Sequence, residues 1–174
     1  MSQSHKDQQP PQLSTSSGLP LVSARQVNYE QLRDLLAAGK WKKADEETTN
    51  CLLIVARRGK ERWLRIEDID NFPCQDLRTI DQLWVKYSHG KFGFSVQKQI
   101  YQNLGGTRQY DKKIWEAFGD KVGWRQEGSW LWYSDLNFNL DTHYMGRLPT
   151  RCCEGRVGVR ERKFILSRTE TCGL

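Results

Sequence analysis

The stretch FPCQDLRTIDQLWVKYSHGKFGFSVQ, residues 72–97, decides the fold of this chain. Its first half carries apolar side chains at helical spacing: Ile80, Leu83, Trp84 and Tyr87. Asp76 is placed to cap that helix, and the Ser88-His89-Gly90 tripeptide predicts the turn that ends it. After Phe92-Gly93-Phe94, Ser95 is a candidate N-cap for a second helix. The stretch therefore predicts two helices joined by a tight, glycine-containing turn.

The same helical spacing continues on both sides of this stretch. Upstream, a stripe of small and apolar residues predicts a longer helix: Trp41, Ala44, Thr48, Cys51, Leu52 and Val55. Downstream, Asp111 is expected to open a helix, residues 124–133 to form a small hairpin or turn, and residues 135–140 to form one more short helix. These patterns predict an all-α domain over residues 28–149. Residues 1–27 are polar and poor in aromatics, which predicts a disordered N-terminal tail.

Charge and cysteine content narrow the class of protein. Much of the formal net charge of +6 comes from residues 147–168, where seven Lys and Arg stand against Glu154 and Glu161. The five cysteines are odd in number and show no C-x-x-C spacing, so we expect neither a structural zinc site nor a disulfide framework. Reduced thiols in a cytosol or stroma are the interpretation that this pattern favours.

Catalytic and membrane signatures are missing from the sequence. There are three histidines and no nucleophile, zinc-protease or phosphate-loop motif, so we expect no enzyme, no catalytic residue and no metal site. No apolar run reaches the roughly 18 residues of a membrane span, and no apolar secretory signal stands at the N-terminus.

The stretch 72–97 resembles the genomes-uncoupled-four family, the porphyrin-binding regulators of magnesium chelatase in oxygenic phototrophs. The match reads F-P-C-x-D-L-R-T-I-D-x-L-W-V-K-Y-S-x-G-x-F-G-F-S-V-Q almost without gaps. Residues 32–48, 63–69 and 115–125 are also similar to that family, so the likeness covers roughly residues 29–149.

The resemblance implies a compact multi-helix domain shaped like a cupped hand, with a concave apolar ligand face. It implies a regulator that binds protoporphyrin IX and Mg-protoporphyrin IX and activates magnesium chelatase through its large, porphyrin-binding subunit. The place of action would be the cyanobacterial cytoplasm or the chloroplast stroma, with peripheral thylakoid or envelope membrane association among the implied contacts. A porphyrin is a flat apolar disc with two propionates, which suits an apolar slot with a cationic rim.

By likeness to the family's cleft, eight residues are expected to contact the porphyrin. Val85 and Phe94 would form the apolar floor, and the same wall would include Phe92, Val96, Gln97 and Ile100. Trp132, for which Trp130 is an open alternative, and Arg168 complete the set, as an aromatic neighbour and a partner for a propionate. Each apolar member has the alternative of being ordinary core, although the two phenylalanines flank a glycine in a turn, where they would form an apolar edge.

The basic C-terminal segment, residues 150–174, leaves three interpretations open. It is a solvated tail, a source of arginines for the propionates, or a contact for an acidic partner or a membrane surface. Its Phe164-Ile165-Leu166-Ser167-Arg168 run is similar to the family's C-terminal element, which implies a helix docked on the cleft with Arg168 at the rim.

The chain departs from the family pattern at one site. Gly146-Arg147-Leu148-Pro149 stands where the family usually has Gly-His-Leu-Pro, which alters the loop next to the expected cleft. This change motivates an alternative function, a signalling or protein-interaction module that binds another pigment or a protein. Nucleic-acid binding is not expected, because the basic residues lie apart from most of the aromatic ones.

Overall fold

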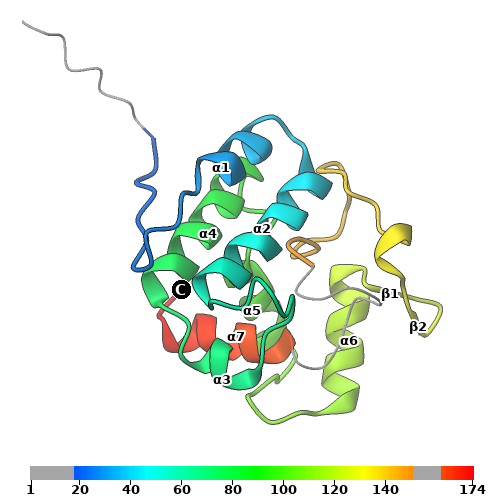
Figure 1. The fold of residues 1–174 in the computed structure, drawn as a ribbon. Helices are drawn as coiled ribbons and strands as arrows, with labels where there is room; N and C mark the ends of the chain where they lie inside the picture. Colours follow the sequence, from blue (N-terminus) through cyan, green and yellow to red (C-terminus); the bar gives the residue numbers. More distant parts are fainter. Residues whose placement is uncertain (1–17, 151–161) are drawn as a thin grey trace, which may run out of the picture.

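The computed structural model describes residues 18–150 and 162–174, which form a mainly helical domain (Figure 1). The α-helices are α1 (Glu30–Ala37), α2 (Trp41–Val55), α3 (Ile66–Asp70), α4 (Cys74–Tyr87), α5 (Phe94–Asn103), α6 (Lys112–Val122) and α7 (Arg162–Thr171). A two-stranded antiparallel hairpin, β1 (Arg125–Gln126) and β2 (Ser129–Trp130), and the 3-10 turn η1 (Tyr133–Asp135) follow α6. The all-α prediction is confirmed, with the hairpin as its small exception.

Helices α1, α2 and α4 pack together and enclose the first core cluster (Figure 1). All six residues of the stripe predicted on α2 are buried. The Trp41, Trp84 and Phe92 rings pack edge to face or tilted, with centroids 5.7 to 6.4 Å apart. The Trp84 indole N–H donates to the Thr48 hydroxyl at 2.9 Å, so the buried polar atom of this large ring is satisfied.

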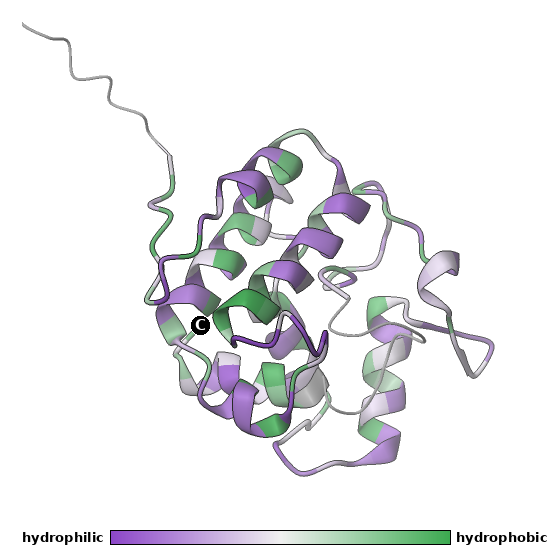
Figure 2. Cartoon of the chain, in the orientation of Figure 1, coloured by the Kyte–Doolittle hydropathy of each residue, from purple (hydrophilic) through white to green (hydrophobic). Residues whose placement is uncertain are grey.

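A second core cluster joins α5, α6 and the hairpin. Tyr101, Trp115, Phe118 and Trp124 supply interlocking rings, and Leu136 and Leu166 close the cluster. Colouring by hydropathy shows both apolar and polar residues along the helices (Figure 2). The apolar sides of the helices therefore form two adjoining cores, which bury the aromatic residues that the sequence has in excess.

The N-terminal segment differs from the prediction of a disordered tail over residues 1–27. Residues 18–27 lie against α4, where the Val22 carbonyl accepts the Thr79 hydroxyl at 2.6 Å. The Ala24 amide and the Ser23 hydroxyl donate to the Asp76 carboxylate. Because these bonds are tertiary, composition alone gave no sign of them. Residues 1–17 lie outside the described part of the chain.

Three local predictions between residues 76 and 140 are corrected by the structure. Helix α4 begins at Cys74 after Pro73, so Asp76 lies inside its first turn. Helix α5 begins at Phe94 after Gly93, so Ser95 is not its cap. Residues 135–140 form no helix beyond the end of η1 at Asp135. The hairpin and the helix opened by Asp111 are confirmed, since the Asp111 carboxylate accepts from the Ile114 amide at 3.0 Å.

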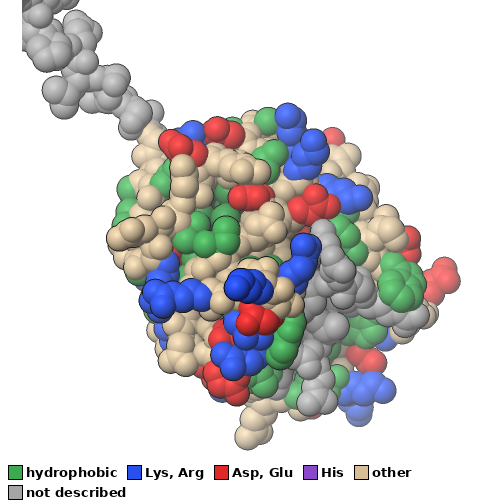
Figure 3. Space-filling model, in the orientation of Figure 1, with side chains coloured by type: hydrophobic (Ala, Val, Ile, Leu, Met, Phe, Trp, Pro, Cys, Tyr) green, Lys and Arg blue, Asp and Glu red, His purple; other side chains and the backbone are tan. Residues whose placement is uncertain are grey.

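The surface carries basic and acidic side chains close together (Figure 3). Around α3, Arg58 pairs with Glu61 and Asp68, and Arg65 pairs with Asp68. These pairs offset part of the positive charge locally. Among the helices in the described ranges, none combines the length and apolar content that crossing a bilayer requires.

Candidate functional site

The predicted site residues gather around α5 and divide by accessibility. Phe92, Phe94 and Gln97 are buried, with at most 3% of their surface exposed. Val85 on α4 and Val96 and Ile100 on α5 are half-buried, and we call these three the apolar trio. Trp132 is exposed and Arg168 is half-buried on α7. The predicted set therefore combines buried residues, which can only support a surface, with residues that keep part of their surface accessible.

The two phenylalanines do not form the exposed apolar edge that the sequence analysis expects. Gly93 between them has φ 137°, and a Cβ there would lie 2.8 Å from Val85 Cγ2, so only glycine allows this approach of α4 and α5. The turn is fixed further by the Gly93 amide, which donates to the Leu148 carbonyl at 3.0 Å. Both rings consequently belong to the first core cluster, and they support α5 from its buried side.

Gln97 fixes the segment that runs along α5 instead of facing solvent. Its side-chain amide donates to the carbonyls of Gly146 and Pro149, each at 2.8 Å. The side chain is 2% exposed, so in this structure it has no surface to offer a ligand. Gln97 therefore has a structural role in place of the predicted ligand contact. The sequence gave no sign of this role, because its two carbonyl partners lie 49 and 52 residues away.

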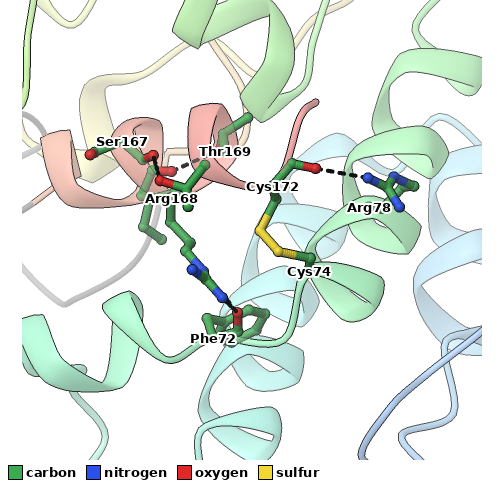
Figure 4. Close-up of a disulfide and its surroundings, with 9 residues drawn as sticks. Phe72, Cys74, Arg78, Ser167, Arg168, Thr169 and Cys172 are labelled. Atoms are coloured by element: carbon green, nitrogen blue, oxygen red, sulfur yellow. Dashed lines mark hydrogen bonds between the residues drawn. A yellow bond between two sulfur atoms is a disulfide. The ribbon is translucent and has the colours of Figure 1, made fainter.

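Arg168 lies where the sequence placed it, on a docked C-terminal helix, but it points at the protein. Its Nε and Nη2 donate to the Phe72 carbonyl at 2.9 and 2.8 Å (Figure 4). These two bonds attach α7 to the chain just before α4. The guanidinium thus holds α7 in place, a correction to its expected role at a cleft rim.

A disulfide next to Arg168 overturns the prediction of reduced thiols without a covalent link. Cys74, the first residue of α4, is bonded to Cys172, the residue after α7 (Figure 4). Their separation of 98 residues left no spacing signal, because only the packing of α7 brings them together. Cys51 is free and buried, and Cys152 and Cys153 lie outside the described residues.

A cavity of about 470 Å³ opens beside the second cluster, and we call it the loop pocket. Its lining includes Leu131, Asn137, Thr142, His143, Tyr144 and Arg147. The volume falls within the range of small-molecule sites, but the lining is mainly polar, which does not suit a flat apolar disc. Trp132 does not line this pocket. Its large apolar ring is exposed to solvent just before η1.

Arg147, where the chain departs from the family pattern, is buried beside the loop pocket. Its guanidinium lies 4.4 Å from the centre of the Tyr144 ring, and Nη2 donates to the Gly123 carbonyl at 3.1 Å. Burial lowers the pKa of this guanidinium from its ordinary value. The side chain therefore belongs to the packing of the loop, a role that the basic character of the segment did not indicate.

Buried carboxylates elsewhere act as links between helices. Asp81 on α4 accepts the Ser95 amide of α5 at 2.8 Å, and burial raises the pKa of its carboxyl. Asp45 on α2 accepts the Thr150 amide at 2.6 Å, and Asp76 accepts the Tyr29 hydroxyl at 2.7 Å. Each carboxylate has a structural partner. Within residues 18–150 and 162–174, no cluster of His, Cys, Asp and Glu has the make-up of a metal site.

Comparison with known proteins gives a consistent result. A family model described as GUN4-like matches residues 22–164. The chain is 42% identical over 108 residues to an uncharacterized protein ycf53 of Pyropia yezoensis, covering 61% of this chain and 43% of that protein. It is 33% identical over 133 residues to a Ycf53-like protein of Synechocystis sp., covering 75% and 54%. The chain spans about half the length of these curated relatives.

Two further similarities bear on the site. A protein of Arabidopsis thaliana named tetrapyrrole-binding protein, chloroplastic, is 31% identical over 98 residues, covering 55% of this chain and 34% of that protein. A structure of GUN4 from Chlamydomonas reinhardtii superposes with a TM-score of 0.69 at 27% identity, covering 87% of this chain and 94% of that chain.

Proposed function

The chain belongs to the GUN4-like family, and on that premise we propose that it is a tetrapyrrole-binding regulatory protein. Its ligands would be protoporphyrin IX and Mg-protoporphyrin IX, and its action would be to activate magnesium chelatase in chlorophyll biosynthesis through the large subunit. The observation that carries the proposal is the family match over residues 22–164. The protein would act by binding alone, with no covalent step assigned to its side chains.

The apolar trio is the surface that we propose for the porphyrin. Val85, Val96 and Ile100 are the predicted apolar residues that keep part of their surface accessible. Phe94 and Gln97 would support this wall from behind, and Trp132 would add an exposed ring. At about 25 cal/mol per Å² of buried apolar surface, covering a few hundred Å² of the disc supplies on the order of 10 kcal/mol before association costs.

The proposal also names a cellular location and a protein partner. Relatives in Synechocystis sp. and a relative named chloroplastic support a cyanobacterial cytoplasm or a chloroplast stroma as the location. Peripheral contact with a thylakoid or envelope membrane belongs to the proposal as the place where the pigment would be handed over. The magnesium chelatase subunit is the protein partner that the proposal names.

Porphyrin titration of the purified protein tests the proposal directly. Protoporphyrin IX and magnesium deuteroporphyrin are added while tryptophan fluorescence quenching is followed, for the wild type and for Val96→Glu. We expect saturable binding at micromolar concentration or tighter, and at least about tenfold weaker binding for Val96→Glu, because a carboxylate is costly to desolvate under an apolar disc. A chelatase assay with the same variant should lose its stimulation in parallel.

Ile54→Glu is the matched control. Ile54 is an apolar residue of α2 that is 55% exposed and lies outside the predicted set, so the same added charge should leave the affinity unchanged. Failure of both porphyrins to bind the wild type would exclude the carrier function. The interaction module suggested by Arg147 would then be the function to pursue, by searching for a protein partner.

A further inference from the structure

We propose that Cys74 and Cys172 are a reversible thiol–disulfide modification site that locks α7 to the body of the protein when oxidised and loosens it when a dithiol reductant acts. The bond joins the first residue of α4 to the residue after α7. The proposed porphyrin binding requires no such bond, so this inference goes beyond it.

Helix α7 depends on its attachments, which is why one more bond matters. With ten residues it is shorter than the about 12–15 residues at which isolated helices become marginally stable in water. Its polar anchors lie in its C-terminal half and just beyond its end: Arg168 donates to the Phe72 carbonyl, Arg78 donates to the Cys172 carbonyl at 2.8 Å, and the Lys98 ammonium donates to the Leu174 carbonyl. The disulfide is the covalent member of this set within the described residues (Figure 4).

The two cysteines differ in exposure, and we expect a reductant to attack the more exposed one. Cys74 is half-buried, whereas Cys172 is 7% exposed, so Cys74 is the expected point of attack. Cys51 contrasts with the pair, because it is 1% exposed and burial raises the pKa of its thiol to about 12. The pair is thus the reactive site, and Cys51 is expected to stay inert.

The chemistry is ordinary thiol–disulfide exchange with a dithiol as the electron donor. One thiolate of the dithiol attacks Cys74 Sγ, the sulfur–sulfur bond to Cys172 breaks, and Cys172 leaves as a thiolate. The second thiolate of the dithiol then displaces Cys74, whose thiolate is favoured at the N-terminus of α4. Two electrons and two protons pass to the protein, and the dithiol becomes a cyclic disulfide.

Reduction should act on both cores, because α7 contributes to each. Ile165 belongs to the first cluster and Leu166 to the second, and α7 packs mainly against α5 and α3. Loosening α7 therefore weakens the support of α5. If the proposed function holds, porphyrin binding at the apolar trio becomes sensitive to the redox state of the disulfide. Only this link to porphyrin binding rests on the proposed function.

Hydrogen exchange with peptide mapping tests the site without any porphyrin. Full-length protein with Cys152→Ser and Cys153→Ser, which keeps the pair and Cys51, is oxidised with a cyclic disulfide and then reduced with dithiothreitol. Non-reducing mapping should recover a peptide cross-linked between Cys74 and Cys172. On reduction, amide exchange over residues 162–174 should accelerate on the order of tenfold or more, while α2 serves as the internal reference.

Two variants separate the bond from its surroundings. In Cys172→Ser, amide exchange over residues 162–174 should be as fast as in the reduced protein, and dithiothreitol should not change it. Arg78→Gln, which removes only the bond to the Cys172 carbonyl, should keep the response. Free, alkylatable Cys74 and Cys172 after oxidation, or exchange over α7 that reduction leaves unchanged, would overturn the inference. Porphyrin titration in both redox states then reports on the ligand proposal separately.

Discussion

At the scale of single residues, buried polar side chains hold segments that the sequence leaves unplaced. Gln97 binds two carbonyls of the segment 146–149, and Asp45 accepts the amide of Thr150. Each such group must be satisfied, because an unpaired polar atom away from water costs about 1–3 kcal/mol. These side chains therefore decide where the segment after the hairpin runs.

Gln97→Leu should destabilise the protein by about 2 kcal/mol or more, because it leaves the buried carbonyls of Gly146 and Pro149 without their donors. Urea unfolding followed by tryptophan fluorescence measures the change. Gln99→Leu is the control, since Gln99 lies on the exposed side of the same helix. Equal stabilities of the two variants would contradict the structural role of Gln97.

Asp81 predicts a pH dependence of stability. Burial raises the pKa of its carboxyl above the ordinary 3.8, so between the two values the folded state binds more protons than the unfolded state. The Asp81 contribution to the free energy of unfolding therefore falls as pH rises from about 3.8 through the raised pKa, and it stays low above it.

Asp81→Asn removes this titration and keeps an oxygen for the Ser95 amide. The stability of the variant relative to the wild type should increase from pH 4 to pH 7, as measured by urea unfolding across that range. Glu46→Gln, on a half-buried carboxylate of α2, gives the comparison. A difference that is flat with pH, or that decreases, would show that burial of Asp81 does not penalise its charge.

At the scale of helices, boundaries follow the sequence where the cap is local and depart from it where the cap is tertiary. Helix α6 begins after Asp111, whose carboxylate caps it. Helix α5 begins after Gly93, and the amide of Ser95 is satisfied by Asp81 of α4 instead of by a neighbouring side chain. A carboxylate from another helix thus replaces the local cap that Ser95 suggested.

Asp111→Ala should cost about 1 kcal/mol, the usual loss for removing an N-cap side chain. The loss should appear first as faster amide exchange in the opening turn of α6, around Ile114. Asp111→Asn, which keeps an acceptor oxygen, should recover most of the stability. Lys113→Ala in the same turn is the control, and an effect of equal size there would rule out capping as the cause.

At the scale of the whole molecule, α7 ties the two core clusters together. Ile165 and Leu166 are neighbours in sequence but belong to different clusters, and both are at most 5% exposed. The C-terminal helix is therefore part of the fold, although the basic charge of residues 150–174 had left a solvated tail as one of three interpretations. The segment between the hairpin and α7 carries Arg147, which packs on Tyr144.

Ile165→Ala and Leu166→Ala should each destabilise the protein by about 2–4 kcal/mol, because each leaves a cavity in a buried cluster. Thermal unfolding by circular dichroism measures both losses. Glu170→Ala, on the exposed side of α7, should change the midpoint little. A tail that is merely solvated would give three equal, negligible effects.

The sequence by itself determined the helical class, the α2 stripe, the Asp111 cap and the family. Each depends on residues close together in the chain: apolar spacing fixes which side of a helix is buried, and a cap lies within one turn of the amide that it binds. The long motif over residues 72–97 fixed the family in the same way, as a contiguous pattern.

Only the tertiary structure decided which of the predicted site residues are accessible, where Arg168 points and that Cys74 meets Cys172. Phe92 and Val96 are both apolar and lie close in the chain, yet Phe92 packs on Trp41 and Val96 keeps part of its surface. Arg168 and Cys172 meet partners 96 and 98 residues away. Contacts across such separations depend on how whole helices pack, and helical periodicity carries no information about that packing.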